Sequence, residues 1–335
     1  MLLRDNPRIK DKNLSMELFA GFDGGGTKTL CVLADENGNI LGTGKGGPSN
    51  YLFCGQELAA QSVRDSIEQA FSQAGVAIRP LRGAYMCSAA TEIYCGERHV
   101  PFFSTCIDAQ QLTCNSDIVP VWYGAAQGAP AIMTISGTGA ATYACWDDQY
   151  AKSSGWGALM GDEGSGYDVG HKAVQIATRI YDKRESDDEF LEAILKHYDI
   201  DTPRALHKIF REGDQRSLVA SATMAVFELY NKGNKTAQKL LEYAADEIVL
   251  AVKTAGREAN FTSPVPLIVS GSLLHKDRAL YGIVEEKIKN NCDVVSHMLP
   301  APMHPAVAAA AMALNEAGRV SASKALLEKG KLLDL

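Results

Sequence analysis

The chain has no excess of positive charge. Its 335 residues include 33 Lys and Arg against 40 Asp and Glu, which gives a net charge of −7. Nucleic acids and anionic membranes attract clusters of Lys and Arg, so this balance argues against both as partners. With 46% hydrophobic and 22% charged residues, the composition is that of a globular protein. The length suits two domains, and we expect a small-molecule partner.

Cysteine patterns typical of metal sites are missing as well. The eight cysteines form no C-x-x-C pair, and no Cys/His cluster has the spacing of zinc ligands. The closest pairs, Cys87/Cys95 and Cys106/Cys114, have a spacing that fits no standard metal site. We interpret the cysteines as reduced, mostly buried thiols of a cytoplasmic protein.

Long apolar runs are also absent. The N-terminal segment MLLRDNPRIKDKNLS is charged and lacks the apolar core of a signal peptide, so we expect residues 1–15 to be an extension. Residues 118–146 carry no charge, but Gly124, Gly128, Pro130 and the SGTG turn at 136–139 interrupt them. We therefore predict short buried pieces joined by loops rather than a membrane span.

A repeated order of strands and turns is visible along the chain. Residues 18–23, 30–33 and 40–41 are predicted strands, separated by turns at 24–26 and 35–38, and a helical stripe covers 54–74. Strands at 131–135 and 141–146 flank another glycine turn at 137–139. This pattern predicts two structurally related halves, each opening with a glycine hairpin.

Helices dominate the remainder of the chain. Apolar stripes predict helices over 165–182 and 236–257, a strand follows at 266–271, and further helices begin at 304 and near 322. We place the domain boundary near residue 118, which gives an N-terminal domain over 16–118 and a C-terminal domain over 119–335. Whether the last helix packs back on the N-terminal domain is left open.

The stretch DGGGTKT at 23–29 allows three interpretations as a phosphate loop. A Walker A loop requires G-x-x-x-x-G-K-[ST], but Thr27 stands where lysine is needed and Lys28 comes one position late. A dinucleotide fingerprint, GTGKGG at 42–47, is followed by PSNY rather than by a helix, so we regard it as a chance match. The third is a hairpin loop whose glycine amides approach phosphate oxygens, with Asp23 holding hydrated Mg²⁺.

A plain glycine-rich β-turn explains that hairpin equally well when it is taken alone. The second hairpin, SGTG at 136–139, favours phosphate binding, because two Gly/Thr loops facing each other can clamp one polyphosphate.

Four motifs in order resemble the BadF/BadG/BcrA/BcrD ATPase and N-acetylglucosamine kinase family. They are DGGGTKT at 23–29, ISGTG at 135–139, GWG with GDEGS at 155–165, and VSGS at 269–272. The resemblance runs from residue 17 or so to 315. It implies the α/β, two-domain actin-like ATPase (ribonuclease H-like) fold of the sugar kinase, actin and heat-shock chaperone superfamily. In that fold each domain has a mixed sheet flanked by helices, with a cleft between the domains.

The resemblance implies ATP and Mg²⁺ as cofactors. The ATP contacts that it carries over are Gly25, Gly26, Thr27, Lys28, Gly137, Thr138, Gly139 and Gly271. Asp23 would hold the metal through water. For Gly271 an ordinary strand-ending turn is the alternative.

The catalytic aspartate of the family corresponds to Asp117 in LTCNSDIVP. A carboxylate there can accept the proton of a sugar hydroxyl while that oxygen attacks the γ-phosphorus. Asp117 also suits a helix N-cap with Pro120 in the first turn, and the two roles do not exclude each other.

Further sugar contacts follow from the same resemblance. Asn50 matches an asparagine that contacts the sugar after the third strand, and Gly155 and Trp156 would shape the pocket wall. Asp162, beside Glu163, would bind sugar hydroxyls. A solvated turn leading into a helix is the alternative for this acidic pair.

One departure from the family concerns the second hairpin. Many members carry serine and another polar residue where this chain has Ala140 and Ala141, so these positions offer the sugar no side-chain hydrogen bond. The identity of the sugar is therefore open.

The implied function is ATP-dependent phosphorylation of the 6-hydroxyl of an amino sugar. N-acetylglucosamine is the first candidate, and glucosamine and N-acetylmuramic acid are alternatives. A different class is an ATPase activator or regulator of the BadF type, including iron–sulfur activators, although no cluster-ligand pair is visible. A nucleotide-dependent scaffold without enzymatic activity is a third. We expect a cytoplasmic homodimer that binds a small-molecule sugar.

Overall fold

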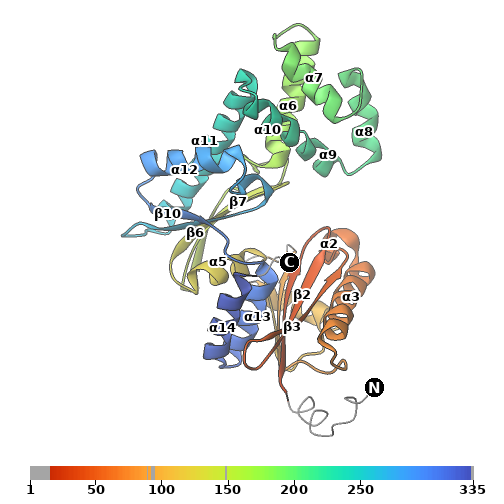
Figure 1. The fold of residues 1–335 in the computed structure, drawn as a ribbon, viewed down its shortest axis with the longest axis vertical. Helices are drawn as coiled ribbons and strands as arrows, with labels where there is room; N and C mark the ends of the chain where they lie inside the picture. Colours follow the sequence, from red (N-terminus) through yellow and green to blue (C-terminus); the bar gives the residue numbers. More distant parts are fainter. Residues whose placement is uncertain (1–15, 89, 92–94, 148, 333–335) are drawn as a thin grey trace, which may run out of the picture. The chain divides into compact units, whose positions relative to one another are not determined.

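The computed structural model describes residues 16–88, 90–91, 95–147 and 149–332. The predicted extension over residues 1–15 lies outside this range. The described chain forms two compact units, one ending at Gln127 and resuming at Ala301, the other spanning Gly128–Pro300. Each unit holds a five-stranded mixed sheet flanked by helices (Figure 1), as the family resemblance predicted.

Unit 1 contains five strands and six α-helices in its described residues. Its elements are β1 (Leu18–Gly24), β2 (Thr29–Asp35), β3 (Ile40–Gly46), α2 (Tyr51–Cys54), α3 (Gln56–Ala74), β4 (Gly83–Ser88), α4 (Val100–Phe103), β5 (Leu112–Asn115), α5 (Ile118–Ala126), α13 (Pro305–Glu316) and α14 (Val320–Gly330).

Unit 2 contains five strands and seven α-helices in its described residues. Its elements are β6 (Ala131–Ser136), β7 (Ala140–Trp146), β8 (Gln149–Ser153), α6 (Gly166–Tyr181), α7 (Asp188–His197), α8 (Leu206–Glu212), α9 (Gln215–Ser221), α10 (Thr223–Asn231), α11 (Lys235–Glu258), β9 (Val265–Ser270), α12 (Ala279–Asn291) and β10 (Val295–Pro300).

The two sheets share one topology. Unit 1 has the order β3-β2-β1-β4-β5, and unit 2 has β8-β7-β6-β9-β10 when it is read in the same direction. In both, three antiparallel strands come first and two parallel strands extend the sheet on the other side of the first strand. The predicted pair of related halves, each opening with a glycine hairpin, is confirmed.

The predicted boundary near residue 118 lies too early in the chain, and the return of the C-terminal end to unit 1, which the sequence left open, does occur. Helix α5 belongs to unit 1, where Ile118, Val119 and Trp122 are buried. A Cβ on Gly124 would lie 3.1 Å from the Cβ of Ala308, so α5 packs closely on α13. The chain also returns to unit 1 at Ala301, and both final helices pack there. Contacts between the apolar faces of helices that are far apart in the sequence decide the division. Local sequence patterns do not reveal such contacts.

Strand β1 alternates between two cores. Leu18, Ala20 and Phe22 pack toward α3, whereas Phe19 packs with the alanines of α13 on the opposite face. In Figure 1 α3 lies on one side of β1–β3, and α13 and α14 on the other. On the α13 face a Cβ at Gly21 would lie 2.0 Å from the backbone nitrogen of Ala310. Glycine at this position is therefore required for α13 to lie directly on the strand.

The GTGKGG stretch lies mostly within strand β3, not in a dinucleotide loop. Gly42, Gly44 and Gly46 face α3, where a Cβ would lie within 2.2 Å of a helix carbonyl oxygen at each position. These glycines allow the helix to approach the strand, which confirms that the fingerprint match is a coincidence.

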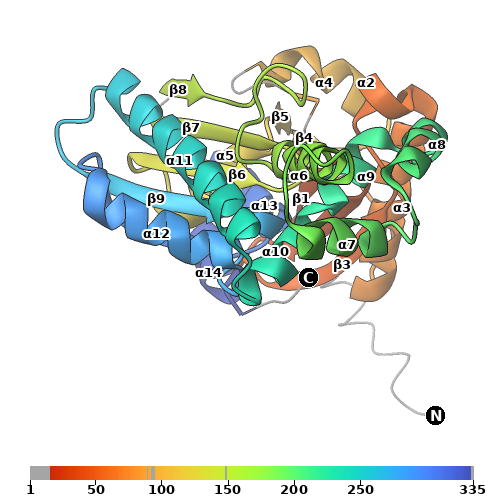
Figure 2. The same ribbon diagram turned by 90° about the horizontal axis from the view of Figure 1, so that it is seen from above.

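Unit 2 is covered by its long helices. α11 packs on β6, β7 and β8, and α12 runs beside α11, as Figure 2 shows. Helices α6–α10 gather at one end of the unit (Figure 1). The uncharged stretch 118–146 forms α5, β6 and β7. None of the helices in the described part of the chain combines the length and apolarity that a membrane crossing requires.

We predict that Gly21→Ala destabilises the protein by about 1 to 3 kcal/mol or more, because the added methyl group must displace the backbone of α13. Gly282→Ala is the matched control: a Cβ at this exposed helix position meets nothing within 4 Å. It should stabilise by about 0.5 to 1 kcal/mol. Urea unfolding of both variants measures this, and equal stability of Gly21→Ala and wild type would contradict the packing account.

Candidate active site

The hairpin between β1 and β2 forms an exposed loop with a fixed base. Gly25 donates its N–H to the Lys28 carbonyl oxygen at 2.9 Å, and the carbonyl of Gly25 accepts from the amides of Ser49 and Asn50. Gly26, Thr27 and Lys28 are exposed. Within the described chain the amides of Gly26 and Thr27 have no acceptor. The loop thus presents N–H groups, a hydroxyl and an ammonium, which is the chemistry that a phosphate requires.

The hairpin between β6 and β7 is tied to helix α6. Gly137 donates to the Gly139 carbonyl oxygen at 2.9 Å. The carbonyl of Gly137 accepts from Gly166 at 2.7 Å, and that of Thr138 accepts from Tyr167 at 3.1 Å. Because the first turn of α6 holds the loop, its backbone is held in place before any ligand binds.

Gly271 lies at the base of this second hairpin. Its φ is 96°, and a Cβ would lie 2.3 Å from the carbonyl oxygen of Ser136. Both the positive φ and the close approach require glycine. Ser272 follows it near Gly137, so the nucleotide-binding residues predicted from two distant motifs lie together in unit 2.

Two carboxyl groups lie close together in unit 1. Asp23 ends strand β1 and Asp117 precedes α5, where its side chain makes no capping hydrogen bond. Burial, together with the charge of Asp117, raises the pKa of Asp23 to about 6, against an opposing effect of Lys28. Burial also raises the pKa of Asp117, whose Oδ1 accepts a hydrogen bond from the Ser116 hydroxyl at 3.2 Å. The pair has the raised proton affinity expected of a general base.

His304 was not predicted as a site residue. Its Nδ1 accepts from the amide of Ala306 at the start of α13, and its Nε2 lies 3.7 Å from Oδ2 of Asp23. Burial, aided by Lys28 and Lys45, lowers the pKa of His304 to about 4. The ring is therefore neutral at pH 7, with its proton on Nε2, facing Asp23. The sequence signal was His-Pro before a small-residue helix, which is a capping pattern and not a catalytic one.

Asn50 has a buried acceptor that the described chain leaves unused. Its side chain does not cap α2, and Oδ1 has no hydrogen-bond partner among the described residues. The hydroxyl oxygens of Ser49 and Thr91 are buried without partners as well. A buried polar atom without a partner is costly unless a ligand or water satisfies it. This supports the predicted contact of Asn50, and it adds two residues that the sequence analysis did not consider.

The segment 155–163 folds around Asp162. The carboxylate is buried, Oδ1 accepts from the amide of Gly157 at 2.8 Å, and Oδ2 accepts from Nη2 of Arg216 at 2.9 Å. Trp156 is exposed with the Lys152 ammonium above its ring, and Glu163 is exposed. Each oxygen of Asp162 thus already has one donor within the protein. The contact with Arg216 was not predicted, because nothing in the sequence joins residues 54 positions apart.

Ala140 and Ala141 open strand β7 beside this segment. A Cβ on Gly155, which has a φ of 79°, would lie 2.6 Å from the Cβ of Ala141. The structure therefore brings the predicted sugar-contacting residues of unit 2 together around the second hairpin, with methyl groups where many family members have polar side chains.

A magnesium ion fits the donor chemistry of unit 1 only if it retains water ligands. No group of three or more His, Cys, Asp or Glu side chains that could hold a metal occurs among the described residues. Burial and the charge of Asp117 disfavour the ionised form of Asp23, and a nearby cation would stabilise that form. Mg²⁺ is commonly bound through one or two carboxylates together with water and substrate phosphates. Asp23 is suited to that arrangement.

Comparison with known proteins agrees with the fold and the motifs. The model of the BadF/BadG/BcrA/BcrD ATPase family matches residues 20–313. An N-acetylmuramic acid/N-acetylglucosamine kinase of Clostridium acetobutylicum is 26% identical over 79% of this chain and 88% of the relative. An N-acetyl-D-glucosamine kinase of Dictyostelium discoideum is 24% identical over 90% of this chain and 99% of the relative.

Among solved structures, a protein of Chromobacterium violaceum that is provisionally named an N-acetylglucosamine kinase has the same fold. The TM-score is 0.72 at 23% identity, and the match covers 90% of this chain and 99% of that protein.

We predict that Asp23→Asn stabilises the protein at pH 7 by on the order of 1 to 3 kcal/mol, because the ionised carboxylate is disfavoured in the folded state. The raised pKa means that this cost is absent below pH 3.8 and complete above pH 6. The gain should therefore shrink as the pH falls from 7 to 4.

Urea unfolding at several pH values checks this, with the exposed Asp65→Asn on α3 as the control. A gain in stability that stays constant with pH, or an equal gain in the control, would show that folding does not raise the pKa of Asp23.

Proposed function

The chain belongs to the BadF/BadG/BcrA/BcrD ATPase family, and from this we propose that it is an ATP-dependent kinase that phosphorylates the 6-hydroxyl of an amino sugar. N-acetylglucosamine is the first candidate, and glucosamine and N-acetylmuramic acid are the alternatives. The observation that carries the proposal is the raised proton affinity of the adjacent carboxyl groups Asp23 and Asp117. The names of the similar proteins support the substrate class.

In this proposal Asp117 is the general base. Burial raises the pKa of Asp117, which makes it a stronger base than an exposed aspartate. It accepts the proton of the sugar hydroxyl as the oxygen attacks the γ-phosphorus, and the bond between that phosphorus and the ADP oxygen breaks. Ser116, which donates a hydrogen bond to the carboxylate, orients the base.

The two glycine hairpins are proposed to bind ATP. Gly25, Gly26, Thr27 and Lys28 of unit 1 supply N–H groups, a hydroxyl and a positive charge to phosphate oxygens. Gly137, Thr138 and Gly139 of unit 2 do so with a backbone that α6 holds in place, and Gly271 lies against the nucleoside. Donors that are oriented before the reaction stabilise the charge of the transferring group without reorganisation.

Mg²⁺ is the proposed metal, held by Asp23 through water. When bound, it supplies positive charge that offsets the phosphates. His304, whose neutral ring has Nε2 3.7 Å from Oδ2 of Asp23, would help to position this carboxylate.

The proposed sugar contacts are Asn50 of unit 1 and the residues of unit 2 around the second hairpin, which are Ala140, Ala141, Gly155, Trp156, Asp162 and Glu163. The unused acceptor of Asn50 supports this role most directly. Location in the cytoplasm and assembly as a homodimer stay predictions from the sequence.

We predict that Asp117→Asn lowers sugar-dependent ADP release by about 100-fold to 10,000-fold, because an amide cannot accept the proton. ATP binding should persist, and the rise in thermal stability that ATP causes measures it. The exposed Asp108→Asn is the control, and it should behave as wild type. Full turnover in Asp117→Asn would remove Asp117 from the role of base.

We also predict an acidic limb in the pH profile of kcat/KM. The carboxylates must be ionised to act, and the pKa of Asp23 is raised to about 6, so activity should fall as the pH drops through 6 rather than through 4. Initial rates between pH 4.5 and 8.5 measure this. A rate that is flat down to pH 5 would mean that neither carboxylate has the environment described above.

A further inference from the structure

The second hairpin has two different sides. On one side Gly137 adjoins Ser272, which follows Gly271 in the predicted nucleotide loop. On the other side a Cβ on Gly139 would lie 2.4 Å from Nη2 of Arg216 and 2.8 Å from Oδ2 of Asp162. The guanidinium group of Arg216 therefore lies beside Gly139 and Asp162, the latter a predicted sugar contact, whereas Ser272 lies beside Gly137.

The position of Arg216 is fixed by packing. It is the second residue of α9, and a Cβ on Gly170 of α6 would lie 2.0 Å from the carbonyl oxygen of Val219, so α9 lies directly on α6. The first turn of α6 in turn holds the hairpin through Gly166 and Tyr167. Arg216 and the hairpin are thus parts of one packed group.

Arg216 keeps unused hydrogen-bond donors. Its side chain is 49% exposed, whereas that of Asp162 is 5% exposed. In the described chain the guanidinium donates to Asp162 through Nη2 alone, although the group carries five N–H bonds. Asp162 orients the guanidinium group of Arg216. The N–H groups that this contact leaves unused can donate to the two oxygens of a carboxylate.

The neighbouring positions have small apolar side chains. Ala140 and Ala141 end in methyl groups, and Gly155 packs against Ala141, where a Cβ would lie 2.6 Å from the Cβ of Ala141. The side chains at these three positions offer a substrate no hydrogen bond. A guanidinium group with unused N–H donors beside such positions is suited to binding a carboxylate carried on a sugar.

We propose that Arg216 is a specificity-determining residue that binds a carboxylate carried on a substituent of the amino sugar. This inference rests on the proposed amino-sugar kinase function. N-acetylglucosamine then remains a substrate, and an amino sugar with an acidic ether substituent, such as N-acetylmuramic acid, is the better one.

The experiment compares N-acetylmuramic acid with its methyl ester, which keeps the bulk but lacks the charge. Wild-type protein should bind the acid about 10- to 100-fold more tightly than the ester in calorimetry, as expected for a charged hydrogen-bonded pair. In turnover assays the difference should appear in KM rather than in kcat. Equal affinity for acid and ester would overturn the proposal without any variant being made.

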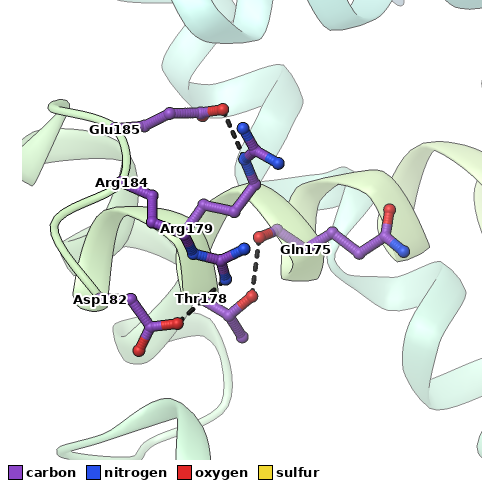
Figure 3. A network of polar contacts seen from close by, with 6 residues as sticks. All are labelled: Gln175, Thr178, Arg179, Asp182, Arg184 and Glu185. Carbon is purple, nitrogen blue, oxygen red and sulfur yellow. Dashed lines mark hydrogen bonds and ion pairs between the residues drawn. The ribbon is translucent and has the colours of Figure 1, made fainter.

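Arg216→Gln should reduce the preference for the acid over N-acetylglucosamine by a similar factor, and Arg216→Lys should restore part of it. Arg184→Gln is the matched control, because Arg184 forms an exposed ion pair with Asp182 at the other end of α6 (Figure 3). It should keep the wild-type preference. If Arg216→Gln lowers kcat equally for both sugars, Arg216 acts on the phosphate or on folding, and the proposal is wrong.

Failure of the proposed function has a different signature. If the protein binds the acid more tightly than the ester but transfers no phosphate to any amino sugar, the kinase proposal falls and the role of Arg216 stands. If N-acetylglucosamine is phosphorylated and the acid has no advantage over its ester, the kinase proposal stands and the role of Arg216 falls.

Discussion

Direct contact between α13 and β1 is the constraint on which the first half of the site depends. Because Gly21 has no side chain, the backbone of α13 can lie directly on the strand, and the alanines of α13 complete the close approach. Because alternate residues of a strand face the same side, Asp23 lies on the same face as Gly21. His304, at the start of α13, is thereby brought to Asp23. A packing requirement thus brings the buried ring of His304 to the carboxyl group of Asp23, the proposed metal-binding residue.

The same arrangement is costly in electrostatic terms. Asp23 and Asp117 share a partly buried environment, and no cationic side chain bonds either of them among the described residues. Burial raises the pKa of each carboxyl group, so the ionised forms are less stable in the folded protein than in water. Perturbed pKa values of this kind cluster at functional sites. Unit 2 differs in this respect, because its buried Asp162 forms an ion pair with Arg216.

Much of the fold could be predicted from local patterns. The two glycine hairpins, the related halves and the long helices follow from periodicity and turn residues, which act over a few positions. The domain division could not be predicted, since α5, α13 and α14 join unit 1 through apolar contacts between distant segments. The positions of the predicted site residues came from a family resemblance in four motifs, and the structure groups them by unit. His304 and Arg216 were missed because a cap and a surface arginine carry no local signal of function.

The most direct test of the account follows phosphorus from ATP to product. The protein is incubated with ATP and, in turn, N-acetylglucosamine, glucosamine and N-acetylmuramic acid, and phosphorus NMR identifies the products while ADP is quantified. The account predicts that at least one of these sugars yields a 6-phosphate, with one ADP formed for each. Release of ADP and inorganic phosphate at a rate independent of every sugar would contradict it and would indicate an ATPase regulator instead.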